Sequence, residues 1–163
     1  MTDSAPAMFV ALEASALGAA IRQSSWAYMV ANVGHILSLM AFAGAIAVMD
    51  LRMMGVFAAT SPGYILRMAR WAAAIAFTGL VLSGLTLFIA EASHVVLNRV
   101  FQIKLGLIAL GLANVVAFEV WVTPKVQRLP PLAPLPNEAR PLAIASLAIW
   151  LCVAACGRLI AYF

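Results

Sequence analysis

The chain has 163 residues, of which 65% are hydrophobic and 10% are charged, and its formal net charge is +4. Soluble domains carry about 45–50% apolar and about 25% charged residues, so a water-soluble domain, a disordered chain and a disulfide-rich scaffold are excluded. The Lys and Arg residues lie near the ends of apolar runs, whereas a nucleic-acid surface gathers them on one face. We therefore expect the lipid bilayer to be a partner, and nucleic acid not to be one.

Residues 1–25 are expected to precede the membrane spans. Apolar residues recur at helical spacing between Met8 and Ile21, and Glu13 and Arg22 lie off that stripe. This pattern predicts one amphipathic helix in the membrane interface, and a disordered tail is the alternative. Asp3 stands where a signal peptide would carry basic residues, so a cleaved signal is not expected.

Four long apolar runs follow, and each exceeds the length of about 20 residues that a membrane-spanning helix needs. The expected spans are residues 26–50, 65–90, 100–123 and 141–160. Ser61 and Pro62 provide a cap and a first-turn proline for the second span, and the prolines in 129–136 predict a stiff connection without helix. The expected fold class is all-α: a polytopic membrane protein in which residues 26–163 form a four-helix bundle.

The basic residues predict the orientation of the spans. One side of the membrane carries six of them: Arg52, Arg67, Arg70, Lys125, Arg128 and Arg140. The other side carries four: Arg22, Arg99, Lys104 and Arg158. Cytoplasmic loops carry the excess of Lys and Arg, so both termini are expected on the outer face. Small residues recur along all four spans and predict close packing of helices, within the chain or with other subunits or further copies.

His35 is the most informative polar residue because it lies well inside the first span. An ionisable residue within the membrane suggests a functional site, and imidazole suits haem iron, copper and zinc. The alternative is a neutral imidazole that is hydrogen-bonded to a neighbouring helix, and in either case His35 should point into the bundle. A rise of 1.5 Å per residue places Gly84 and Gly157 at its depth and His94 about 15 Å away, so His94 is expected to be an ordinary loop residue.

Three further residues join His35 as candidate cofactor ligands or contacts. Lys104 either reaches the membrane surface or points inward to a haem propionate, a quinone oxygen or a lipid phosphate. Asn114 lies slightly nearer the inner side. Trp150, near mid-membrane, needs a partner for its indole N–H or packs against a cofactor. Any bound cofactor is therefore expected in the outer half of the bundle, where most buried polar groups should lie.

Cysteine provides a second set of candidate ligands. Cys152 and Cys156 share one face of the fourth span and could hold copper(I) together with His35, with Met40 as a further candidate. Isolated buried cysteines otherwise behave as small apolar residues.

The remaining charged residues and motifs point away from catalysis. Asp50 and Arg52 end the first span and are expected to form a local ion pair or to anchor a loop. Nucleotide-binding, zinc-protease, serine-hydrolase and haem-attachment motifs are absent from the sequence. We therefore expect no independent enzymatic activity.

Three short runs are distinctive: Arg22-Gln23-Ser24-Ser25-Trp26, Asn32-Val33-Gly34-His35-Ile36-Leu37 and Asp50-Leu51-Arg52-Met53-Met54-Gly55. Together with 98–104 and Asn114, they resemble a bacterial four-helix inner-membrane family of unknown function. The likeness covers roughly residues 12–118 and implies a bacterial inner membrane, in which the outer face expected for both termini from the basic residues is the periplasmic one. The layout is more loosely similar to b561-type membrane cytochromes and to copper-resistance membrane proteins, which use helix histidines as haem or copper ligands.

Three functions agree with these features. The first is a membrane-embedded redox or anchor subunit that binds b-type haem or quinone near His35, with the sixth haem position empty or filled by Met, Lys104 or a second protomer. The second is a structural subunit without a cofactor. The third is a copper or small-cation module that uses His35, Cys152 and Cys156. A haem absorption band, stoichiometric copper, or neither, would distinguish the three.

Overall fold

The computed structural model describes residues 5–162, which form helices joined by turns and loops without any strand. Its four long helices are α3 (Ser25–Met53), α4 (Pro62–Ala90), α6 (Arg99–Trp121) and α8 (Ala139–Leu159). Each is long and apolar enough to cross a membrane. The expected all-α fold with four spans is therefore confirmed, and every expected span lies within three residues of its helix.

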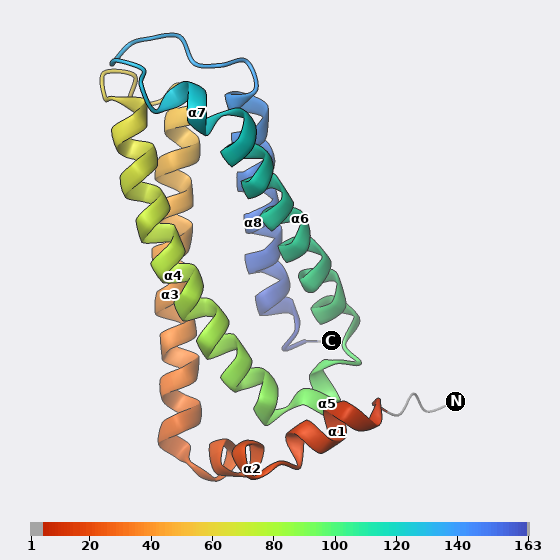
Figure 1. Ribbon diagram of the computed structural model, residues 1–163. Coiled ribbons are helices and arrows are strands. Elements are labelled where there is room, and N and C mark those ends of the chain that lie inside the picture. The colour runs from red at the N-terminus through yellow and green to blue at the C-terminus, as the bar shows by residue number, and fades with distance from the viewer. Residues whose placement is uncertain (1–4, 163) are drawn as a thin grey trace.

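The long helices form two pairs. α3 packs along α4, α6 packs along α8, and α3 also contacts α8. The pairs lie close together near α7 (Thr123–Val126) and diverge toward the opposite end (Figure 1). α4 and α6 face each other without packing along their length, and we call this open side the α4–α6 seam.

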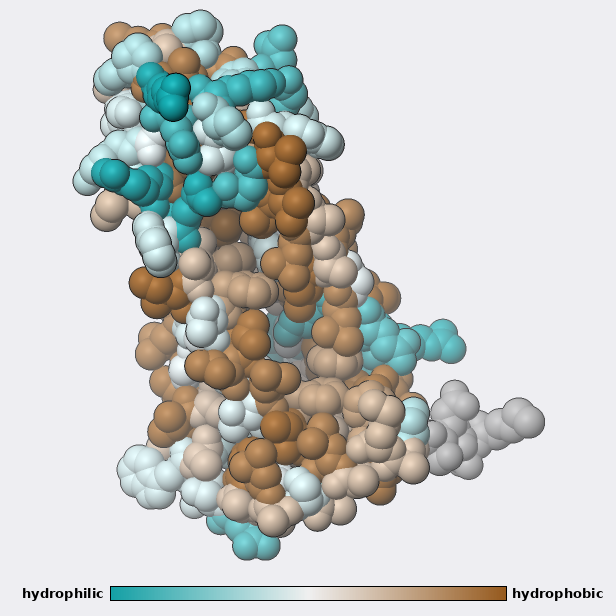
Figure 2. Space-filling view, viewed as in Figure 1, coloured by the Kyte–Doolittle hydropathy of each residue, from teal (hydrophilic) through white to brown (hydrophobic). Residues whose placement is uncertain are grey.

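The hydrophobic core lies in the half of the bundle near α7. Its most deeply buried members come from α3, α4, α7, α8 and the junction between α6 and α7: Met53, Leu66, Val122, Val126, Ala139 and Ala143. Figure 2 shows hydrophilic residues gathered at this end of the molecule and mostly hydrophobic residues along the helices below it. This distribution is what a bundle surrounded by lipid along its length requires.

The connection between α3 and α4 is held by Arg52, whose side chain is only 2% exposed. Its guanidinium donates to the carbonyl of Thr60 at 2.9 and 3.2 Å and to that of Ala58 at 3.5 Å. Gly55 adopts a φ of +104°, which glycine tolerates without strain. Arg52 is thus the expected loop anchor, whereas the ion pair with Asp50 is wrong because the guanidinium turns to the loop carbonyls and Asp50 lies near Ser146 of α8 instead.

The other sequence features near this end are borne out in most respects. Pro62 takes the first turn of α4, and Ser61 stands at the cap position but its side chain makes no capping hydrogen bond. Residues 127–138 contain no helix, as the prolines predicted. The amide of Leu132 donates to the Ala58 carbonyl at 3.1 Å, so this connection rests against the α3–α4 loop.

The N-terminal segment forms two helices instead of the single helix expected over 8–21. They are α1 (Ala7–Glu13) and α2 (Ala16–Gln23). The break occurs because the Ser15 side chain accepts a hydrogen bond from the Gly18 amide and so caps a new helix. Both helices lie across the diverging ends of the two pairs (Figure 1).

Side chains of α1 tie this segment to the end of α4 and to α5 (Ala92–Val95). The rings of Phe9 and Phe88 meet edge to face at 6.0 Å, and Phe88 stacks on Phe101 of α6 at 5.5 Å. The Glu13 carboxylate accepts hydrogen bonds from both the hydroxyl and the amide of Ser93, the latter at 2.8 Å. The alternative of a disordered tail is therefore wrong for residues 5–25.

We expect the attachment of α1 to be lost at acidic pH. The two hydrogen bonds from Ser93 hold the pKa of Glu13 below its ordinary value of 4.5. A carboxyl group whose pKa is lowered by folding contributes stability above its unfolded pKa and loses it as the pH falls through the folded pKa. Protection of the amides of residues 7–13 from hydrogen exchange, relative to their intrinsic rates, should therefore fall below pH 4.5, while protection in α8 is retained.

The Ser93→Ala variant provides the comparison. It removes the hydroxyl donor, so the loss of protection should begin at a higher pH than in the unaltered protein. Equal protection of residues 7–13 at all pH values in both proteins would contradict this attachment.

Candidate functional site

His35 points from α3 toward α4, as predicted, with Nδ1 2.9 Å from the Ser83 hydroxyl oxygen. The Ser83 hydroxyl donates to the Gly79 carbonyl at 2.6 Å, so its hydrogen is already used. Nδ1 of His35 is therefore the donor to Ser83, and Nε2 of the neutral ring keeps a free lone pair. Gly84 gives the ring room, because a Cβ there would lie 3.3 Å from Cε1 of His35.

Among the other candidates expected near His35, Lys104 is near enough for its charge to act on the imidazole, and Cys156 is near enough to act on Lys104. Lys104 lies beside α8, where a Cβ on Gly157 would be 3.5 Å from Nζ. Cys152 is exposed, and Met40 is 68% exposed. Within residues 5–162, no group of three or more His, Cys, Asp or Glu side chains is placed to hold a metal ion.

We expect His35→Leu to lower the free energy of unfolding by about 1 kcal/mol or less, the usual net value of one hydrogen bond. The reason is that Ser83 keeps its bond to the Gly79 carbonyl when the imidazole is removed. Thermal unfolding in detergent measures the effect, with Ser83→Ala as the comparison. A much larger loss in His35→Leu alone would show that Nε2 holds a further group.

A cavity of about 490 Å³ lies in the half of the bundle near α7, between all four long helices. Its wall is mostly apolar, and five aromatic side chains line it: Phe42, Trp71, Phe77, Phe118 and Trp150. The Trp150 ring meets those of Phe42 and Phe77 edge to face at 4.8 and 6.1 Å. Gly111 lies against the same ring, because a Cβ there would be 2.8 Å from Cζ2.

Two polar groups in the cavity wall lack hydrogen-bond partners within residues 5–162. They are the carboxylate of Asp50, which is 0% exposed, and the indole N–H of Trp150, which is 9% exposed. Ser146 and Asn114 line the same cavity, and Asn114 donates to the Leu142 carbonyl at 3.2 Å. Buried polar groups without partners are rare and costly, so Asp50 and Trp150 mark this cavity as the candidate site.

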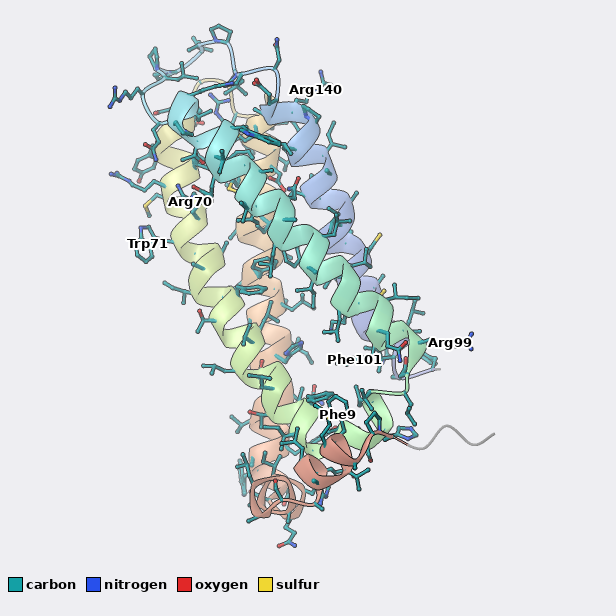
Figure 3. The ribbon with its side chains drawn as sticks, turned by 45° about the vertical axis from the view of Figure 1, so that its right-hand side comes forward. Phe9, Arg70, Trp71, Arg99, Phe101 and Arg140 are labelled. Carbon is teal, nitrogen blue, oxygen red and sulfur yellow. The ribbon has the colours of Figure 1, made fainter. Side chains whose placement is uncertain are left out.

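An ion pair crosses the α4–α6 seam beside the cavity. Nε of Arg70 lies 2.8 Å from Oε1 of Glu119, and the two side chains are 40% and 34% exposed. Figure 3 shows Arg70 and Trp71 near the α7 end of α4, with Phe101 at the opposite end of α6. The pair therefore joins α4 to α6 at the edge of the cavity, which both residues also line.

The predicted site residues therefore divide between two depths. Asn114 and Trp150 line the cavity, whereas His35 and Lys104 do not. Asp50 follows His35 by 15 residues on α3, which is about 22 Å along the helix. The expectation that buried polar groups gather in the outer half, near the termini, is wrong because the cavity and its polar wall lie near α7.

The comparisons with known proteins define the family but no activity. DUF6644, described as a family of unknown function, matches residues 8–163. The chain belongs to this family. The match includes the proline-rich connection and α8, which the sequence resemblance did not cover. Comparisons with curated proteins and with solved structures gave no match, so the looser similarity to b561-type cytochromes and copper-resistance proteins stays a prediction.

Proposed function

We propose that this DUF6644 protein is a membrane-embedded subunit that takes a lipid-soluble small molecule from the bilayer into its cavity. The observation that carries the proposal is Asp50, which is fully buried without a partner in the wall of a mostly apolar cavity. Ligand sites are typically apolar pockets with a few convergent polar groups. Ionisable residues inside membrane spans are costly and therefore indicate function.

The α4–α6 seam provides the route of entry. α4 and α6 do not pack along their length, and the Arg70–Glu119 pair that crosses the seam is partly exposed. A molecule dissolved among the acyl chains would reach the cavity sideways, without first passing through water. This route favours ligands that partition into lipid.

The nature of the wall favours an organic ligand without a metal. Of the residue types that ligate haem iron, the lining contributes only Met49 among the described residues. A b-type haem bound at Nε2 of His35 would lie outside this cavity wall, with its sixth position empty or filled by Met, Lys104 or another copy. The redox or anchor role expected from the sequence is thus better served by a ligand without iron in this cavity.

The orientation in the membrane is part of the same proposal. The side with six Lys and Arg residues, which includes Arg67 and Arg70, would face the cytoplasm of a bacterial inner membrane. Both termini would then be periplasmic. After replacement of Cys152 and Cys156, a cysteine introduced at Asn137 should react with a membrane-impermeant maleimide only in inside-out vesicles. Reaction in right-side-out vesicles alone would reverse the orientation.

The ligand site can be tested with a photoactivatable probe. The protein in lipid nanodiscs is irradiated with a long-chain alcohol that carries a diazirine, and the labelled peptides are identified by mass spectrometry. Ala73 lines the cavity, so Ala73→Phe should fill it and abolish labelling of the lining peptides of α3 and α8. Ala72→Phe, on the exposed face one position earlier, is the matched control and should not change labelling.

Two measurements decide the outcome. Circular dichroism must show that both variants retain their helices. Labelling confined to the lipid-exposed faces, and equal in Ala73→Phe and the unaltered protein, would overturn the proposal.

A further inference from the structure

The two polar groups without partners restrict the chemistry of the ligand. The Asp50 carboxylate accepts hydrogen bonds but receives none of ordinary geometry within residues 5–162, the Ser146 hydroxyl being its neighbouring donor, and the Trp150 indole N–H donates and has no acceptor there. A ligand that satisfies both must carry a hydrogen-bond donor and a separate acceptor. Purely hydrocarbon ligands would leave both groups unpaired.

The two groups lie at different depths in the cavity. The Trp150 ring contacts Phe42 at 4.8 Å, and Phe42 precedes Asp50 by eight residues, about 12 Å along α3. The two groups therefore project into the cavity from α3 and α8 at different depths. A ligand that meets them with separate atoms carries its donor and its acceptor at opposite ends of its polar part.

The surroundings favour a flat, uncharged body between these ends. Phe42, Phe77 and Trp150 meet edge to face in the cavity wall, which leaves aromatic surface available to a ring. The charged residues of the lining are Asp50 and Glu119 on one hand and Arg67 and Arg70 on the other, so their formal charges cancel. A neutral ring compound suits this balance better than an ion.

We propose, on the basis of the function proposed above, that the ligand is a para-quinol or its quinone. One quinol hydroxyl donates to the Asp50 carboxylate, and the oxygen at the opposite end of the ring accepts from the Trp150 indole N–H. An isoprenoid tail leaves through the α4–α6 seam into the bilayer. A lipophilic amine would satisfy Asp50 but would leave Trp150 without an acceptor.

The assignment predicts a preference between redox forms. A quinol has hydroxyl hydrogens to donate to an ionised carboxylate and a quinone has none, so Asp50 should bind the quinol about tenfold more tightly. Asparagine both donates and accepts, so Asp50→Asn should remove the preference. Trp150→Phe should weaken the binding of quinol and of quinone by a similar factor, about three- to tenfold, because the second ring oxygen accepts a hydrogen bond in either form.

Calorimetric titration of nanodisc-embedded protein with decylubiquinol and decylubiquinone tests this, without oxygen and at mildly alkaline pH to keep the carboxyl group ionised. Ala72→Phe is the control and should bind like the unaltered protein. Equal binding of the two forms by the unaltered protein, or an unchanged preference in Asp50→Asn, would overturn the assignment.

A second probe separates this inference from the function on which it rests. Tight binding of decylamine that Asp50→Asn abolishes, together with no quinol binding, would replace the quinol by an amine while leaving the lipid-soluble site intact. Loss of the diazirine labelling pattern would instead overturn the site itself.

Discussion

Arg52→Leu is expected to lower the free energy of unfolding by about 2–3 kcal/mol, because hydrogen bonds from charged donors contribute more than neutral ones. The buried guanidinium makes three hydrogen bonds to the carbonyls of Thr60 and Ala58, and leucine replaces none of them. The loop between α3 and α4 would lose its attachment to the end of α3. The amide of Leu132 donates to the same Ala58 carbonyl, so the loop around Leu132 would also lose this attachment when the α3–α4 loop moves.

Thermal unfolding in detergent, followed by circular dichroism, measures this effect. The free energy of unfolding of Arg52→Lys should lie between that of Arg52→Leu and that of the unaltered protein, because an ammonium group cannot span the same carbonyls as a planar guanidinium. Arg128→Leu, an exposed position at the same end of the molecule, is the matched control and should change stability by about 0.5 kcal/mol or less. Equal losses in Arg52→Leu and Arg128→Leu would contradict the anchoring role.

Gly111→Ala is expected to destabilise the bundle and to displace Trp150 from its position in the cavity wall. The added Cβ would lie 2.8 Å from Cζ2 of Trp150 and 3.1 Å from two further ring atoms. The indole cannot easily move aside, because it packs against Phe42 and Phe77. Overpacking of this kind costs about 1–3 kcal/mol, which exceeds the gain of about 1 kcal/mol that alanine brings to a helix.

Gly106→Ala on the same helix is the control, and its expected change in stability has the opposite sign to that of Gly111→Ala. A Cβ at Gly106 would meet nothing within 4 Å, so only the gain in helix propensity remains and stability should rise slightly. Thermal unfolding of the two variants, with tryptophan fluorescence to follow the indole, makes the comparison. Similar stability changes in both would show that Trp150 yields to the new methyl group.

The sequence predicted the spans well because their length and composition are set directly by the bilayer. The depth of a residue followed from helical rise, so Gly84 was correctly placed at the depth of His35. The rotation of each helix could not be derived in this way, because lipid and protein core both favour apolar side chains. For that reason neither the α4–α6 seam nor the cavity was foreseen.

Asp50 shows why the candidate site was only partly predicted. Its neighbour Arg52 and its place near the end of a span suggested a local ion pair, yet the structure turns Arg52 to the loop and Asp50 to the cavity. On a helix, residues two apart point to different sides, and this spacing was the available signal. Trp150 was recognised because a buried indole N–H needs a partner, although its relation to Asp50 depended on packing between α3 and α8.

The unequal lengths of the two helix pairs give the protein two hydrophobic thicknesses. α3 and α4 have 29 residues each, about 44 Å of helix, while α6 and α8 have 23 and 21, about 35 and 32 Å. A hydrocarbon layer of about 30 Å matches the shorter pair and leaves the longer one mismatched. The longer pair therefore tilts, draws the surrounding lipid outward or extends its polar ends, such as the one with Arg67 and Arg70, beyond the layer, and the response to membrane thickness is expected mainly at α3 and α4.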